Sequence, residues 1–127
     1  MDTDNKVMSK VEKKSLAEGL ERSFVELPTF KANWKRLGLD DEDLRDLQNA
    51  ILNSPEQGIP LGSNAFKIRF KPKDTNHGKN TSHRAIYVDV IKESKIYLTN
   101  AFSKADEANL TSEELKAVRA FAKEMNS

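Results

Sequence analysis

Residues 65–71 read AFKIRFK, and apolar and cationic side chains alternate strictly from Phe66 onward. Successive side chains of a β-strand point to opposite faces of the sheet, so this period of two separates the apolar residues from the cations. The apolar face is expected to build a core. The cationic face, which consists of Lys67, Arg69 and Lys71, has two interpretations: a binding site for a polyanion, or charges that only solvate the open face of an antiparallel sheet.

The positive charge of the chain is concentrated around this stretch. Residues 60–104 carry nine basic residues (Lys or Arg) and three acidic ones. Residues 1–59 carry nine basic and twelve acidic residues, and residues 105–127 carry three basic and five acidic residues. The net charge of the whole chain is only +1. Because a uniformly basic protein would adhere non-specifically to polyanions, a basic segment inside a nearly neutral chain favours a localised site.

Length and composition predict one ordinary domain. The 127 residues suffice for a single hydrophobic core, and 37% hydrophobic with 32% charged residues is typical of a globular protein. The chain has no cysteine, which excludes disulfides, thiolate catalysis and cysteine-ligated zinc. No stretch has the apolar length of a membrane span, and residues 1–26 lack the apolar run of a signal peptide. We therefore expect a cytoplasmic protein with no membrane partner.

Two parts of the chain differ in pattern. Residues 1–22 are polar with weak helical periodicity, and we interpret them as a helical or partly disordered extension. Residues 23–127 are predicted to form the folded domain. In this domain a short strand over residues 24–28 precedes two helices, the first ending at Gly38 and the second capped by Asp40. The short loop between the helices predicts an αα-hairpin.

Strands and a last helix complete the predicted domain. Three strands are expected after the hairpin, over residues 65–71, 83–91 and 95–102. A turn-rich segment precedes them, and a long polar loop separates the first two. Thr111 and Glu114 form a capping-box pattern that opens the final helix. The predicted fold class is α+β in the order β-α-α-β-β-β-α: a small, mainly antiparallel sheet with an N-terminal αα-hairpin and a C-terminal helix, the helices packed on one face.

Several segments match the pattern of a known family. The stretches GSNAFKIR at 62–69 and GKNTSHRAIY at 78–87 follow one another in the chain, flanked by FVELPTF at 24–30, DDEDL at 40–44 and FSKADEANLT at 102–111. This series resembles the RelE and HigB toxins of type II toxin–antitoxin systems, in the RelE/ParE superfamily. Those toxins show a Gly-rich turn, then Leu-Arg-Lys-Ile-Arg, then Gly-Lys-Ser-Gly-Gly-x-Arg-Val-Ile-Tyr. The resemblance covers about residues 23–122.

The resemblance implies an mRNA interferase, a toxin that cleaves mRNA on the ribosome and that a cognate antitoxin neutralises. The attacking group is then the 2′-hydroxyl next to the scissile phosphate, so the reaction needs no metal ion and no cofactor. The protein must orient that hydroxyl, stabilise the charge added to the phosphate and assist two proton transfers. Arginine suits the charge role through its forked donors, and lysine suits either role.

The resemblance also assigns roles to individual residues. Lys67 and Arg69 match the Lys and Arg of the family's basic strand, and Arg84 matches the Arg before Val-Ile-Tyr. Lys104 matches the Lys at the end of the last strand. These four are the expected catalytic residues. Five others are expected to bind RNA: Lys71, Lys73, Lys79, His83 and Tyr87.

Alternatives remain for single residues and for the whole domain. Arg84 shares a strand face with apolar residues and can be a strand-end arginine that snorkels, His83 can be an exposed strand-end histidine, and Tyr87 can be a packing residue. A ParE-like toxin that binds a topoisomerase, or a nucleic-acid-binding domain without catalysis, would use the same basic face. In each toxin case that face, or the final helix, is also the expected contact of an acidic antitoxin segment.

Overall fold

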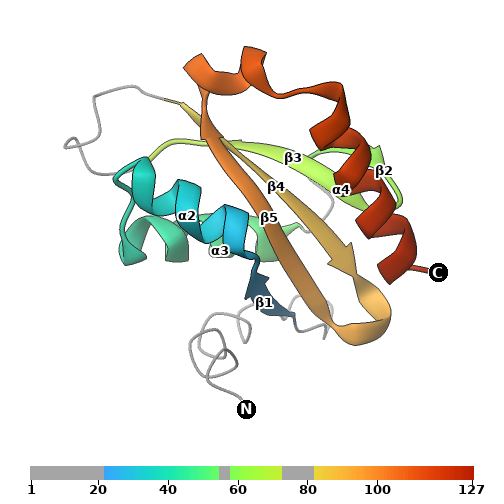
Figure 1. Cartoon of the computed structure of the whole chain (residues 1–127). Coiled ribbons are helices and arrows are strands. Elements are labelled where there is room, and N and C mark those ends of the chain that lie inside the picture. Colours follow the sequence, from blue (N-terminus) through green and yellow to red (C-terminus); the bar gives the residue numbers. More distant parts are fainter. Residues whose placement is uncertain (1–21, 55–57, 73–81) are drawn as a thin grey trace.

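The computed structural model describes residues 22–54, 58–72 and 82–127. It contains one five-stranded sheet in the order β1-β5-β4-β3-β2, and helices lie on both of its faces (Figure 1). The strands are β1 (Ser23–Glu26), β2 (Ile59–Gly62), β3 (Ala65–Phe70), β4 (His83–Val90) and β5 (Lys95–Ser103). The helices are α2 (Pro28–Arg36), α3 (Asp41–Asn53) and α4 (Ser112–Met125), with 3₁₀ segments η2 (Ile91–Glu93) and η3 (Lys104–Asn109). No helix within the described ranges is long and apolar enough to cross a membrane.

The α+β class and the mainly antiparallel sheet are confirmed. Strands β2 to β5 pair antiparallel with their neighbours, and β1 alone joins β5 in parallel. The sheet has one strand more than predicted, because β2 occupies the segment that was interpreted as turn-rich. Pro60 and Gly62 weaken the strand pattern there, but β2 lies at the sheet edge, where the missing N–H of Pro60 breaks no ladder.

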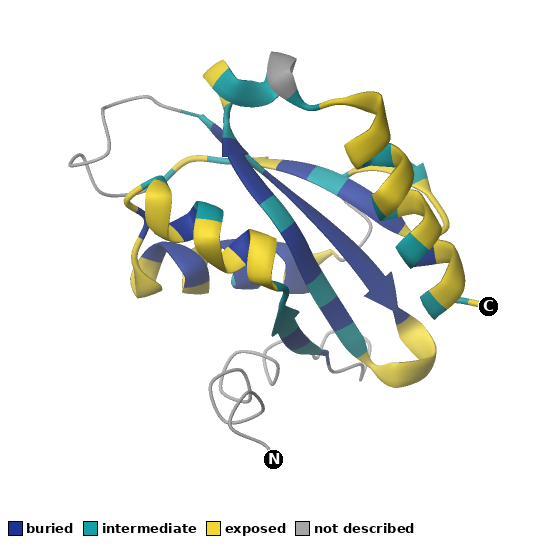
Figure 2. Cartoon of the chain, in the orientation of Figure 1, coloured by how far each residue is buried: buried dark blue, intermediate teal, exposed yellow. Residues whose placement is uncertain are grey.

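The two faces of the sheet carry separate cores. One core packs α2 and α3 against the sheet and includes Phe24, Phe30, Trp34, Leu47, Ile51, Phe66, Ile68, Tyr87 and Leu98. The other is smaller and packs α4 against the sheet through Ala65, Val88, Val90 and Ala122. The prediction that all helices cover one face is therefore wrong. Residues 85–90 of β4 are all buried, as Figure 2 shows, because this strand is covered on both sides.

The predicted αα-hairpin is formed by α2 and α3, and local sequence features explain its structure. The Trp34 ring stacks between Phe30 and Phe70, at centroid distances of 5.2 Å and 5.5 Å, and its Nε1 donates to the Asp40 carbonyl at 3.2 Å. Gly38, just after α2, has a φ of +76°, which a glycine adopts at little cost. Asp40 then caps α3 by accepting from the Asp43 backbone N–H at 2.8 Å, which completes a capping box.

The last helix is anchored at both ends. Thr111 and Glu114 form the predicted capping box at the start of α4. Near its other end, Asn126 donates to the carbonyl of Ser63 at 2.9 Å. Ser63 and Asn64 form the two-residue turn between β2 and β3, and both have positive φ, as a type I′ hairpin turn requires. These contacts fix α4 over the hairpin of β2 and β3.

A buried ion pair joins the residue that precedes β1 to strand β4. Arg22 and Asp89 of β4 are 4% and 2% exposed, and the Arg22 Nε lies 2.8 Å from the Asp89 Oδ1. A second contact joins Arg22 Nη2 to Asp89 Oδ2 at 3.4 Å. Arg22 was assigned to the N-terminal extension by the sequence, and residues 1–21 lie outside the described residues, so the division of the chain at residue 22 stays a prediction.

Candidate functional site

The register of β3 and β4 brings three of the predicted cations together. Arg69 pairs directly with Arg84 across the two antiparallel strands, so their side chains are neighbours on one face. Lys67 lies two residues before Arg69 on that same face and pairs with Ile86. Like charges opposite one another destabilise an antiparallel pair, so the stability of the sheet does not explain this placement.

These cations line a cavity of about 340 Å³ on the α4 side of the sheet. The lining residues are Gly58, Ile59, Lys67, Ile68, Arg69, Arg84 and Glu107. The sheet face that carries them also carries Ala65 and Val88, which α4 covers. One face of the sheet is thus divided into an apolar part under α4 and a cationic part beside η3.

Glu107 of η3 is bound by two of the three cations. Its Oε2 lies 2.5 Å from the Lys67 Nζ, and its Oε1 lies 3.2 Å from the Arg84 Nε. The hydrogen bond from Lys67, together with the charges of Lys67 and Arg84, lowers the pKa of the Glu107 carboxyl below its usual range. The carboxylate is therefore ionised at neutral pH and bridges the two strands.

Arg84 is enclosed in the wall of this cavity. Its side chain is 12% exposed, so the alternative of a guanidinium that snorkels into solvent is wrong. The Nη1 atom is buried and makes no hydrogen bond to any residue in the described ranges. A buried donor without an acceptor is costly, and Arg84 lines the cavity in which an anion would supply one.

Gly58 contributes to the site by close approach of its backbone. A Cβ atom added there would lie 2.8 Å from the Lys67 carbonyl oxygen and 3.0 Å from the Phe66 Cβ. Only glycine lets the chain pass so near β3, so Gly58 fixes the cavity wall beside Lys67. In the sequence, Gly58 belongs to the turn-rich segment before the strands and was not predicted as a site residue. Glu107 was not among the predicted site residues either.

The other predicted site residues are not gathered at the cavity. Lys71 lies exposed beyond the end of β3 and Lys104 lies exposed in η3, and neither lines the cavity. Lys73 and Lys79 fall outside the described residues. Those four assignments stay predictions.

Two predicted RNA-binding residues are buried on the opposite sheet face. The His83 side chain is 3% exposed and its ring lies 5.8 Å from that of Phe70, so the expectation of an exposed histidine is wrong. Tyr87 is 0% exposed and stacks on Phe66 at 5.4 Å, which confirms the packing alternative. The reason is alternation, because odd-numbered residues of β4 face α2 and α3 while Arg84 faces the other way.

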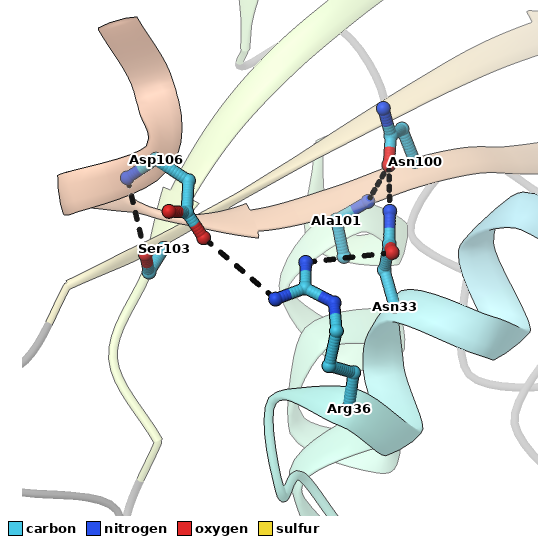
Figure 3. A network of polar contacts seen from close by, with 6 residues as sticks. All are labelled: Asn33, Arg36, Asn100, Ala101, Ser103 and Asp106. Atoms are coloured by element: carbon cyan, nitrogen blue, oxygen red, sulfur yellow. Dashed lines mark hydrogen bonds and ion pairs between the residues drawn. The ribbon is translucent and has the colours of Figure 1, made fainter. Parts of the chain in front are cut away.

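A polar network holds the segment that carries Glu107 (Figure 3). Asn33 of α2 donates to the Asn100 side chain of β5 at 2.7 Å and accepts from Arg36 at 3.4 Å. Arg36 also lies 3.9 Å from the Asp106 carboxylate of η3. The Ser103 hydroxyl accepts from the Asp106 backbone N–H at 3.2 Å and so caps η3. Asp106 and Glu107 thus extend from η3 toward different partners.

Residues 27–127 match the family model described as RelE toxin of RelE / RelB toxin-antitoxin system. The chain belongs to the RelE toxin family. It is therefore the toxin of a toxin–antitoxin system and pairs with an antitoxin. No curated protein matches the chain significantly. All seven cavity residues of this RelE-family toxin lie within the matched range.

Proposed function

We propose that this RelE-family toxin is a cytoplasmic endoribonuclease that cleaves mRNA on the ribosome. The observation that carries the proposal is the charge of the cavity. Among the described residues, three cationic side chains, from Lys67, Arg69 and Arg84, line it together with one carboxylate, that of Glu107. The positive charge exceeds what the carboxylate neutralises, and the excess favours a ligand that brings more than one anionic oxygen, as a phosphodiester does.

The apolar part of the cavity supports a nucleotide rather than a bare anion. Ile59 lines the same cavity and is 61% exposed, so an apolar side chain there is open to a ligand. A ribose or base placed against Ile59 would bury it while the phosphate meets the cations. The combination of one apolar wall and one cationic wall fits a single nucleotide of an RNA strand.

In the proposed reaction the 2′-hydroxyl gives its proton to solvent water, its oxygen attacks the adjacent phosphorus, and the bond to the 5′-oxygen of the next nucleotide breaks. The 5′-oxygen takes up one proton, so the products are a 2′,3′-cyclic phosphate and a 5′-hydroxyl, and the bonds and protons balance without a metal ion. Arg84 stabilises the charge that develops on the phosphate, and Arg69 neutralises the phosphate at the more exposed side of the cavity. In this proposal Lys67 delivers a proton to the leaving oxygen.

A reconstituted translation reaction tests the proposal. The purified chain is added to ribosomes translating a defined mRNA, and primer extension maps any cleavage. We expect cuts within translated codons, none on the same mRNA without ribosomes, and no cuts after addition of the antitoxin. Arg45→Ala serves as a control for loss of an exposed arginine, since Arg45 lies on α3 across the sheet.

Other outcomes would replace the proposal. Inhibition of DNA supercoiling by a topoisomerase without any mRNA cleavage would assign the toxin to the ParE-like alternative. RNA binding without cleavage or supercoiling inhibition would leave a nucleic-acid-binding domain.

A further inference from the structure

The Glu107 carboxylate has the contacts that a phosphodiester would have in this site. Each of its two oxygens meets one cation, Oε2 at the Lys67 Nζ and Oε1 at the Arg84 Nε. A phosphodiester likewise presents two equivalent non-bridging oxygens that share one negative charge. Charge-assisted hydrogen bonds to Lys and Arg are the contacts that either group favours.

We propose that Glu107 occupies the phosphate subsite of the free toxin, and that the scissile phosphodiester of RNA replaces it between Lys67 and Arg84. The inference rests on the proposed function and deepens it, because it names the two cations that hold the reacting phosphate and the group that competes with it. The substrate must then displace an internal carboxylate before the reaction.

One hydrogen-bond donor of the site has no acceptor within the described ranges while Glu107 bridges the two cations. With Glu107 bound, the Arg84 Nη1 is buried without an acceptor among the described residues. The oxygens of a phosphodiester are arranged tetrahedrally rather than in the plane of a carboxylate, so a non-bridging oxygen can be directed at the Arg84 Nη1. Satisfying a buried donor favours exchange of the carboxylate for the phosphate.

Outside the Glu107 bridge, η3 is attached by polar contacts, among them a backbone hydrogen bond from the Lys104 N–H to the Ser82 carbonyl at 3.0 Å. On its other side η3 is held by the Arg36–Asp106 pair, whose atoms are 3.9 Å apart and whose side chains are 57% and 41% exposed. Such a contact is screened by solvent and contributes little. Glu107 itself is 30% exposed, so water and ligand can reach it. Displacement of the Glu107 side chain therefore requires no change in either hydrophobic core, since neither core contains it.

Glu107 is poorly suited to the alternative role of general base. The hydrogen bond from Lys67 lowers the pKa of the carboxyl, and a base of low pKa accepts a proton inefficiently. Both carboxylate oxygens are also engaged by cations. The geometry therefore fits a competing anion better than a proton acceptor.

Binding of two probes to the full-length chain tests the proposal. The probes are a 2′-O-methyl oligoribonucleotide, which keeps the phosphodiesters but blocks the attacking hydroxyl, and inorganic phosphate. Fluorescence anisotropy follows the oligonucleotide, and the NMR shift of the Arg84 Nε–H follows phosphate. We expect Glu107→Gln to lower the dissociation constant of both probes about fivefold, the loss of one competing ion pair.

Asp106→Asn is the matched control. It removes the same charge from the neighbouring residue of η3, but Asp106 lines a separate cavity of about 320 Å³ that also contains Arg36. We expect it to change either dissociation constant less than twofold. Equal tightening in both variants means that only net charge matters, and it overturns the proposal.

Cleavage assays separate this proposal from the nuclease assignment. Displacement predicts that Glu107→Gln cleaves mRNA at least as fast as the unaltered toxin at limiting substrate, whereas a general base predicts a loss of about 10²-fold or more. The loss would overturn the proposal. Selective tightening by Glu107→Gln in a chain that cleaves no mRNA would support the subsite and refute the nuclease. Cleavage with unchanged probe binding in Glu107→Gln would do the reverse.

Discussion

Strand β4 carries two ion-pair groups that differ in stoichiometry and in exposure. Asp89 meets one arginine, Arg22, and both side chains are almost fully buried. Arg84 shares one carboxylate, Glu107, with Lys67, and these side chains are 12%, 30% and 22% exposed. The first group is almost fully buried, which suits a fixed structural contact. The second has surplus cations in a cavity that solvent reaches, which suits a contact that a ligand exchanges.

The largest expected effect concerns the buried pair. Asp89→Ala removes the carboxylate that faces the buried Arg22 guanidinium, so we expect the free energy of unfolding to fall by about 3–5 kcal/mol in urea denaturation. Asp106→Ala breaks the exposed pair with Arg36 and should cost less than about 1 kcal/mol. A loss near 1 kcal/mol for Asp89→Ala would mean that the buried Arg22–Asp89 pair contributes no more to stability than an exposed pair does.

A smaller effect is expected at Gly58, whose substitution should affect both the fold and the site. A methyl group there meets the Lys67 carbonyl oxygen at 2.8 Å, so Gly58→Ala should destabilise the domain by about 1–3 kcal/mol and weaken phosphate binding. Gly62→Ala is the control. It is strained by a φ of +111°, but a Cβ there would meet only the Arg119 Cδ, at 4.0 Å, and Gly62 does not line the cavity, so the substitution should destabilise the domain without changing phosphate binding. Equal binding by both variants would exclude a role for Gly58 in shaping the cavity.

The smallest expected effect is the pH dependence of the Glu107 bridge. Because the folded-state pKa of this carboxyl is lowered, the bridge stabilises the fold above the usual carboxyl pKa, and this stabilisation disappears as pH falls through the lowered value. The difference in unfolding free energy between the unaltered chain and Glu107→Gln should therefore be constant near neutral pH and shrink in acid. A difference that grows in acid would contradict the assigned sign.

Local sequence patterns, within a few residues of one another, predicted most of the fold. The alternation in AFKIRFK gave β3 and its faces, because a period of two depends only on strand geometry. The capping residues of α3 and α4 were likewise readable, since caps are local. Strand β2 was missed because Pro60 is tolerated only at an edge, and edges are set by the whole sheet. The placement of α4 was missed although the unbroken apolar run in β4 indicates burial on both faces.

The candidate site was only partly predictable, because part of it depends on contacts between residues that are far apart in the sequence. Lys67, Arg69 and Arg84 were identified, and their meeting follows from strand pairing. Alternation along β4 would also have separated His83 and Tyr87 from Arg84, since they stand at positions of opposite parity. Glu107 had no local signal, because it meets Lys67 across 40 residues of sequence and only tertiary packing joins them.

The most direct test measures activity and stability on the same two variants, Arg84→Ala and Arg22→Ala. Arg84→Ala should lose about 10²–10³-fold in ribosome-dependent cleavage rate while its unfolding free energy stays within about 1 kcal/mol, because it also removes the repulsion with Arg69. Arg22→Ala should be destabilised by about 3–5 kcal/mol, and its folded fraction should cleave at the rate of the unaltered toxin. An Arg84→Ala variant that is folded and cleaves mRNA at full rate would contradict the assignment of the cationic cavity as the catalytic site.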